Sequence, residues 1–281
     1  MPVVGGFGQA CKCRSCGGGR RLVDVSRGVY ASGTGEDLVV ILHGLGCSKQ
    51  SFAPLWTALE SWSVSVLAPD LPGHGLAAAV SDEFLTVSGM AAYVSRIVGD
   101  HDHRCSRVHV IGHSLGGAVG LHLVQESPIP VVSFVNVEGN LVSSDCGASR
   151  AIAGSQPQDA ARTGASVVEA LGVENHRPSY QLWAGWLENS PPAALHATAG
   201  SLVAESDHGR LLQAFTDLAI PKTYVYGSDS ANPKVLQLLR DITAIRIADA
   251  DHLVMEDQPA QFTQAVIEWL QPQLGHKTTR T

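Results

Sequence analysis

The feature that most constrains this chain is the pentapeptide Gly112-His113-Ser114-Leu115-Gly116, which stands between a strand-like run and a helix-like run. Residues 107–111 before it suit a β-strand, and the small residues 117–124 after it suit a helix. Glycines two positions either side of a serine permit a strained turn that a Cβ would obstruct. The turn places the serine hydroxyl at a helix N-terminus, whose free N–H groups stabilise negative charge. Ser114 is therefore a candidate nucleophile; the alternative is a structural Gly-rich turn with a solvated serine.

Length and composition restrict the class of protein. The 281 residues fit one large domain, or a core domain that carries an insertion. An apolar content of 44% with 16% charged residues is typical of a globular protein with a sizeable core. The formal net charge of −7, with no basic stripe, argues against nucleic acid as a partner. No apolar run reaches membrane-spanning length and no signal-peptide core is visible, so we expect a cytoplasmic protein with no membrane partner.

The cysteines offer one candidate metal-binding cluster, Cys11, Cys13 and Cys16, in a Gly-rich stretch. A closed zinc site needs four ligands, and no partner pair follows at the required spacing. We therefore expect residues 1–20 to be a disordered Gly/Cys-rich extension, and we assign no metal.

Apolar runs alternate with amphipathic runs along most of the chain, which predicts a mostly parallel sheet in a three-layer α/β domain. An edge hairpin is expected at 21–31. Further strands are expected at 38–42, 64–68, 107–111, 130–137, 223–226 and 242–247, and helices at 50–61, 88–100, 117–124 and 261–270.

The alternation stops over residues 143–215, which are rich in Ala and have a composition that favours helix. We interpret this stretch as a helical cap inserted into a core made of 21–142 and 216–275. A cluster of large side chains in it suggests a mainly apolar substrate pocket, although the same residues could instead bury the cap on the core. The cluster consists of Tyr180, Leu182, Trp183, Trp186 and Leu187.

Four short segments, taken in order, resemble the α/β-hydrolase fold superfamily, and the resemblance extends over residues 21–272. The segments are His43-Gly44-Leu45-Gly46, Asp70-Leu71-Pro72-Gly73-His74-Gly75, the Ser114 pentapeptide with Gly117, and Asp251-His252. The resemblance implies a three-layer α/β-hydrolase fold. It also implies an oxyanion hole formed by the backbone N–H groups of Leu45 and Leu115.

The resemblance identifies His252 as the general base, because a serine hydroxyl at neutral pH needs a neighbouring base to take its proton. His252 lies in a loop after the last expected strand and ahead of a Glu-x-x-Pro stretch. Asp251 stands where the superfamily usually has glycine, so the backbone of this loop is expected to differ slightly.

Two residues compete for the acid that would orient His252. Superfamily members mostly place an aspartate at the fourth position of a turn that here reads Gly227-Ser228-Asp229-Ser230, so Asp229 is one residue early. Glu138 directly follows the strand at 130–137, where haloalkane dehalogenases and zearalenone-type lactonases place their acid. Because an unpaired carboxylate at a buried strand end would be costly, we prefer Glu138 and keep Asp229 as the alternative.

These residues together predict a serine hydrolase that cleaves a carboxylic ester or a lactone through an acyl-enzyme on Ser114, with no cofactor. The expected partner is a small-molecule, mainly apolar carbonyl substrate, and the expected state is a monomer or homodimer. A C–C bond hydrolase, a cofactor-free dioxygenase and a non-catalytic binding protein of the same fold remain alternatives.

Overall fold

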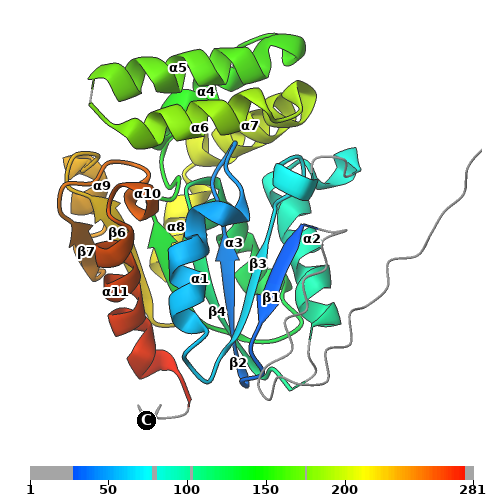
Figure 1. Ribbon diagram of the computed structural model, residues 1–281, viewed down its shortest axis with the longest axis vertical. Coiled ribbons are helices and arrows are strands. Elements are labelled where there is room, and N and C mark those ends of the chain that lie inside the picture. Colours follow the sequence, from blue (N-terminus) through cyan, green and yellow to red (C-terminus); the bar gives the residue numbers. More distant parts are fainter. Residues whose placement is uncertain (1–27, 78–80, 102–103, 175, 276–281) are drawn as a thin grey trace, which may run out of the picture.

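The computed structural model describes residues 28–77, 81–101, 104–174 and 176–275, and in this part of the chain a seven-stranded sheet forms the centre (Figure 1). The expected N-terminal extension, with its three cysteines, lies outside the described residues. The strand order is β1-β3-β2-β4-β5-β6-β7; β1 runs antiparallel to β3 and every other pair is parallel. The predicted three-layer α/β architecture is therefore confirmed. The strands are β1 (Val29–Ser32), β2 (Asp37–Leu42), β3 (Ser65–Pro69), β4 (Arg107–His113), β5 (Val131–Val137), β6 (Lys222–Gly227) and β7 (Ala244–Ile247).

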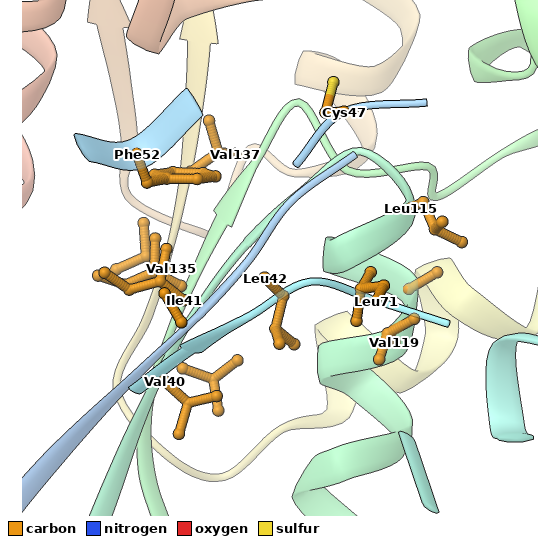
Figure 2. Close-up of a cluster of buried hydrophobic side chains, with 14 of the residues drawn as sticks. Val40, Ile41, Leu42, Cys47, Phe52, Leu71, Leu115, Val119, Val135 and Val137 are labelled. Carbon is orange, nitrogen blue, oxygen red and sulfur yellow. The ribbon is translucent and has the colours of Figure 1, made fainter. Parts of the chain in front are cut away.

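Helices cover both faces of the sheet, which explains why the central strands are apolar without alternation. In Figure 1, α1 (Ala53–Leu59) and α11 (Pro259–Leu270) lie on one face, and α2 (Val87–Asp100), α3 (Leu115–Glu126) and α8 (Arg210–Asp217) lie on the other. All six residues of β2 are buried between these layers. Figure 2 shows part of this core, with Leu71, Leu115 and Val119 gathered on one side and Phe52 and Val135 on the other.

The chain between β5 and β6 forms a separate group of helices above one end of the sheet (Figure 1). The group contains α4 (Gly147–Ala153), α5 (Ala160–Glu174), α6 (Pro178–Glu188) and α7 (Pro192–Asp207). Within it, α5 packs along α6 and α4 packs against α7. The next helix, α8, returns to the sheet, where the ring of Phe215 lies 5.9 Å from that of Phe134 in β5. The proposed cap boundary at residue 215 therefore falls inside α8, and the division into core and cap remains a proposal.

The helix expected at 50–61 is divided in two. A 3₁₀ turn at Lys49–Phe52, capped by the Ser48 side chain, precedes α1, which has Pro54 in its first turn. The turn is fixed by a buried ion pair, because Lys49 Nζ lies 2.5 Å from Asp70 Oδ2 and the Lys49 N–H donates to Asp70 Oδ1. Asp70 therefore has a structural role, because its carboxylate joins two loops.

The remaining helices, α9 (Pro233–Leu238) and α10 (Val254–Asp257), flank the last strand. No helix among the described residues is long and apolar enough to cross a membrane. Cys47, Cys105 and Cys146 are buried, and none of these three forms a disulfide. The residues that the structure describes contain no cluster of three or more His, Cys, Asp or Glu side chains suited to a metal ion.

The close packing of α3 on the sheet can be tested at Gly120. A Cβ at this position would lie 2.6 Å from the Phe134 ring, so we expect Gly120→Ala to lower the free energy of unfolding by about 1–3 kcal/mol. Gly200→Ala in α7 is the matched control, because a Cβ there meets no atom within 4 Å and should stabilise the helix by up to about 1 kcal/mol. Urea unfolding measures the free energy of unfolding of each variant. Equal changes in the two variants would contradict the close packing at Gly120.

Candidate functional site

Ser114 lies in a strained turn between β4 and α3. Its backbone has φ 51° and ψ −118°, a left-handed conformation that costs a non-glycine residue energy. The turn requires glycine on both sides, since a Cβ on Gly112 would lie 2.3 Å from the Gly116 carbonyl oxygen and one on Gly116 would lie 2.3 Å from that of Leu42. Leu115 begins α3, so its N–H has no acceptor within the helix.

His252 follows β7, and its backbone is held from two sides. Its N–H donates to Asp251 Oδ1 at 2.8 Å, and Nε2 of His113 lies 2.9 Å from its carbonyl oxygen. The two imidazole rings are 4.8 Å apart. Asp251, which replaces the usual glycine, is itself anchored because its N–H donates to Asp257 Oδ2. The substitution therefore supplies an acceptor for the loop.

His113 is unsuited to carrying protons. Complete burial and the neighbouring His252 hold the pKa of His113 well below its usual value of 6.5, so the ring is neutral. A carbonyl oxygen only accepts, so Nε2 must be the protonated nitrogen that donates to His252. His113 thus positions the His252 loop through one hydrogen bond.

Glu138 lies beside His252. Its Oε2 is 3.6 Å from Nδ1 of His252, which is ion-pair distance but longer than a normal hydrogen bond. Its Oε1 accepts from the Gly227 N–H at 2.8 Å and from Ser230 Oγ at 2.6 Å. Glu138 also has a positive φ of 48°, which a non-glycine residue adopts at a cost. Ser230, at the position where the superfamily usually has its acid, therefore donates to the carboxylate of Glu138.

Asp229 has a different partner. Its carboxylate pairs with the guanidinium of Arg177 and accepts from Ser228 Oγ, and its side chain is 48% exposed. These hydrogen bonds, that of Ser228 first, lower the pKa of Asp229 below its ordinary value. The structure therefore brings Glu138 rather than Asp229 beside His252. The catalytic roles of Ser114, His252 and Glu138 stay predictions.

The hydroxyl of Ser114 has a partner that the sequence did not indicate. Ser114 Oγ donates to Asn140 Oδ1 at 3.2 Å, and the Asn140 amide nitrogen donates to the Asp145 carbonyl oxygen at 2.7 Å. Asn140 lies two residues after Glu138, in the loop that follows β5, and this position was the only signal in the sequence that Asn140 could lie near the site. The position does not determine which way the amide group points.

A cavity of about 140 Å³ lies beside these side chains. Its lining includes Leu45, Ser114, Asn140, Trp183 and His252. The predicted nucleophile, base and oxyanion loop therefore share one cavity. A second cavity, of about 200 Å³, is also lined by His252 and includes Glu138.

Helix α6 places the helical insertion directly on the site. Trp183 Nε1 donates to the Leu45 carbonyl oxygen at 2.8 Å, and the Trp183 ring lies 5.5 Å from that of His252. Leu187 occupies the space beside Gly46, where a Cβ would come within 2.3 Å of it. Tyr180, Trp183 and Leu187 share the buried face of the helix, whereas Leu182 is 43% exposed. The expected apolar cluster is therefore only partly correct, because the helical repeat turns Leu182 to solvent.

The His252 loop carries a carboxyl group whose ionisation is disfavoured. Burial, and then the charge of Asp257, raise the pKa of Glu256 in α10 from 4.5 to about 7. The folded state thus prefers protonated Glu256, and stability is lost as the pH rises from about 4.5 to about 7. We expect Glu256→Gln to remove part of this loss, so that the variant gains stability over wild type at pH 8 and not at pH 4.5.

Urea unfolding at the two pH values measures this effect. Glu188→Gln on the exposed side of α6 is the control, and it should leave the pH dependence unchanged. A Glu256→Gln variant with the wild-type pH dependence would contradict the raised pKa.

Comparison with known proteins adds a family assignment to this geometry. Residues 39–265 match the model of a family described as "Alpha/beta hydrolase family". The pimeloyl-(acyl-carrier protein) methyl ester esterase of Aeromonas hydrophila is 29% identical over 267 residues, which cover 86% of this chain and 98% of that protein. The magnesium-chelatase 30 kDa subunit of Rhodobacter capsulatus is 32% identical over 124 residues, 44% of this chain and 43% of its own. This chain thus spans less than half of the second relative.

Solved structures resemble the whole fold. A variant of the N-acyl homoserine lactonase AidH, complexed with N-hexanoyl homoserine lactone, superposes with a TM-score of 0.68 at 21% identity and covers 91% of this chain and 98% of its own. MenH from Staphylococcus aureus gives a TM-score of 0.67 at 14% identity and covers 87% and 98%. At these identities the likeness demonstrates the fold alone.

Proposed function

The chain belongs to the alpha/beta hydrolase family and is a hydrolase of the esterase type, and from this premise we propose that it cleaves small carboxylic esters or lactones through an acyl-enzyme on Ser114. The observation that carries the proposal is that Ser114, on a strained turn, shares one cavity with His252, whose Nδ1 lies 3.6 Å from Oε2 of Glu138. The predicted cytoplasmic location and monomeric or dimeric state remain predictions.

In the proposed reaction, His252 takes the proton of Ser114 as the serine oxygen attacks the substrate carbonyl. The N–H groups of Leu45 and Leu115 stabilise the oxyanion that forms, aided by the positive end of α3. His252 then protonates the leaving alcohol. In the second half of the reaction, water attacks the acyl-enzyme, again with His252 as the base, and the carboxylic acid and the free serine are released.

Glu138 is the proposed orienting acid. Its Oε2 faces Nδ1 of His252, which favours the tautomer with the proton on Nδ1 and leaves Nε2 free to accept from Ser114. The two donors on Oε1, the Gly227 N–H and the Ser230 hydroxyl, hold the carboxylate in place. The pairing of Asp229 with Arg177 leaves it no comparable contact with His252.

The cavity limits the substrate. Its volume of about 140 Å³ is close to that of a cavity that holds one benzene molecule, about 150 Å³. We propose that the group held beside Ser114 is short and that any longer part of the substrate extends outward. The esterase and lactonase relatives act on an ester and a lactone, which supports the same bond class.

Replacing Ser114 by Ala tests the nucleophile. We expect loss of at least about 10⁴-fold in kcat on short p-nitrophenyl esters, with the fold retained, because the attacking oxygen is removed. A fluorophosphonate probe should label wild type at Ser114 and leave Ser114→Ala unlabelled. Ser88→Ala, at an exposed position in α2, is the control and should be labelled like wild type. An unlabelled and inactive wild-type protein would instead indicate a non-catalytic binding protein.

Replacing each carboxylate by its amide tests the acid. We expect Glu138→Gln to reduce kcat by about 10³- to 10⁴-fold, because an amide cannot stabilise the imidazolium. Asp229→Asn removes a carboxylate that pairs with Arg177 rather than with His252, and it should change kcat by less than about tenfold. Steady-state kinetics on the same ester compares the two variants, and the reverse order of losses would identify Asp229 as the acid.

A further inference from the structure

Asn140 presents a buried acceptor of fixed orientation to the nucleophile. The residue is 2% exposed, and its amide nitrogen lies 2.7 Å from the Asp145 carbonyl oxygen and 3.7 Å from Cys146 Sγ. A carbonyl oxygen can only accept, so the nitrogen of the amide must face Asp145. Its Oδ1 must consequently face Ser114 Oγ, 3.2 Å away. The amide cannot turn over without losing the bond to Asp145.

This arrangement conflicts with the reactive one. The hydroxyl of Ser114 has a single proton, which in the structure is donated to Asn140 and which in the proposed reaction must be donated to His252. When Ser114 turns to the base, Oδ1 of Asn140 loses its donor. A buried acceptor left without a donor is unfavourable, so a substrate that replaces the lost bond is favoured over one that cannot.

We propose that Asn140 is a specificity-determining residue whose Oδ1 accepts a hydrogen bond from the substrate as Ser114 turns to His252. Because Oδ1 lies 3.2 Å from the oxygen that attacks, the donor must lie close to the scissile carbonyl. The substrate class is therefore esters or lactones with a hydroxyl or amide N–H on the first or second carbon from the carbonyl. This inference rests on the proposed function and narrows its substrate.

Pairs of matched esters test the inference on the wild-type protein. Ethyl 2-hydroxypropanoate is compared with ethyl 2-methoxypropanoate, and ethyl 3-hydroxybutanoate with ethyl 3-methoxybutanoate. The methoxy ester keeps the oxygen and its inductive effect but has no proton to donate. We expect kcat/KM to be at least about tenfold higher for the hydroxy ester in one pair or both. Equal values in both pairs, as would follow if water served Oδ1 equally well, would overturn the inference.

The variant Asn140→Ala separates the hydrogen bond from the size of the methoxy group. The preference for the hydroxy ester should fall to near unity in the variant, and a preference that persists would overturn the inference. Asn189→Ala, at an exposed position after α6, is the matched control and should keep the wild-type preference.

The labelling rate gives a readout that a merely structural role would not produce. A fluorophosphonate has no donor for Oδ1, so in wild type its reaction breaks the bond between Ser114 and Asn140 without replacing it. Asn140→Ala should therefore be labelled faster than wild type while hydrolysing the hydroxy ester more slowly. Slower labelling, in a variant whose thermal unfolding shows it to be folded, would overturn the inference. Absence of both labelling and turnover in wild type would overturn the proposed function instead.

Discussion

The close approach of backbone to backbone around Ser114 is the constraint on which the rest of the site depends. Gly116 brings α3 so near β2 that a Cβ would lie 2.3 Å from the Leu42 carbonyl oxygen, and a Cβ on Gly117 would lie 3.0 Å from the Gly139 Cα in the loop after β5. The ends of three neighbouring strands therefore lie around the N-terminus of one helix. The loops that leave these ends carry Leu45 and Asn140, so the proposed oxyanion loop and the acceptor at Ser114 follow from one packing requirement.

The position of Glu138, the proposed acid, has consequences beyond His252. The turn after β6 supplies two donors, the Gly227 N–H and the Ser230 hydroxyl, that fix the Glu138 carboxylate. Asp229 is then available to Arg177, which also donates to the Asp249 carbonyl oxygen at 2.8 Å. Arg177 directly precedes α6, so the same turn anchors the start of the helix that lies over the site.

Helix α6 in turn limits what the site can hold. Trp183 Nε1 donates to the Leu45 carbonyl oxygen and its ring lies against that of His252, so the proposed oxyanion loop and the proposed base share a contact from the insertion. Leu187 fills the space that glycine leaves at position 46. Because a ring and a branched side chain of this helix fill the space above Leu45 and Gly46, the cavity beside Ser114 is limited to about 140 Å³.

The sequence alone determined the sheet and the candidate residues, because apolar runs and glycine spacing are local signals; the strand expected at 107–111, for example, lies within β4, Arg107–His113. It also limited the candidates for the acid that would orient His252 to Glu138 and Asp229. Only the tertiary structure placed Glu138 beside His252, since that choice depends on how the loops after β5 and β6 meet. The sequence also could not predict that Asn140 accepts from the Ser114 hydroxyl. The Asn140 amide is oriented by the Asp145 carbonyl oxygen, and this contact forms only in the folded protein.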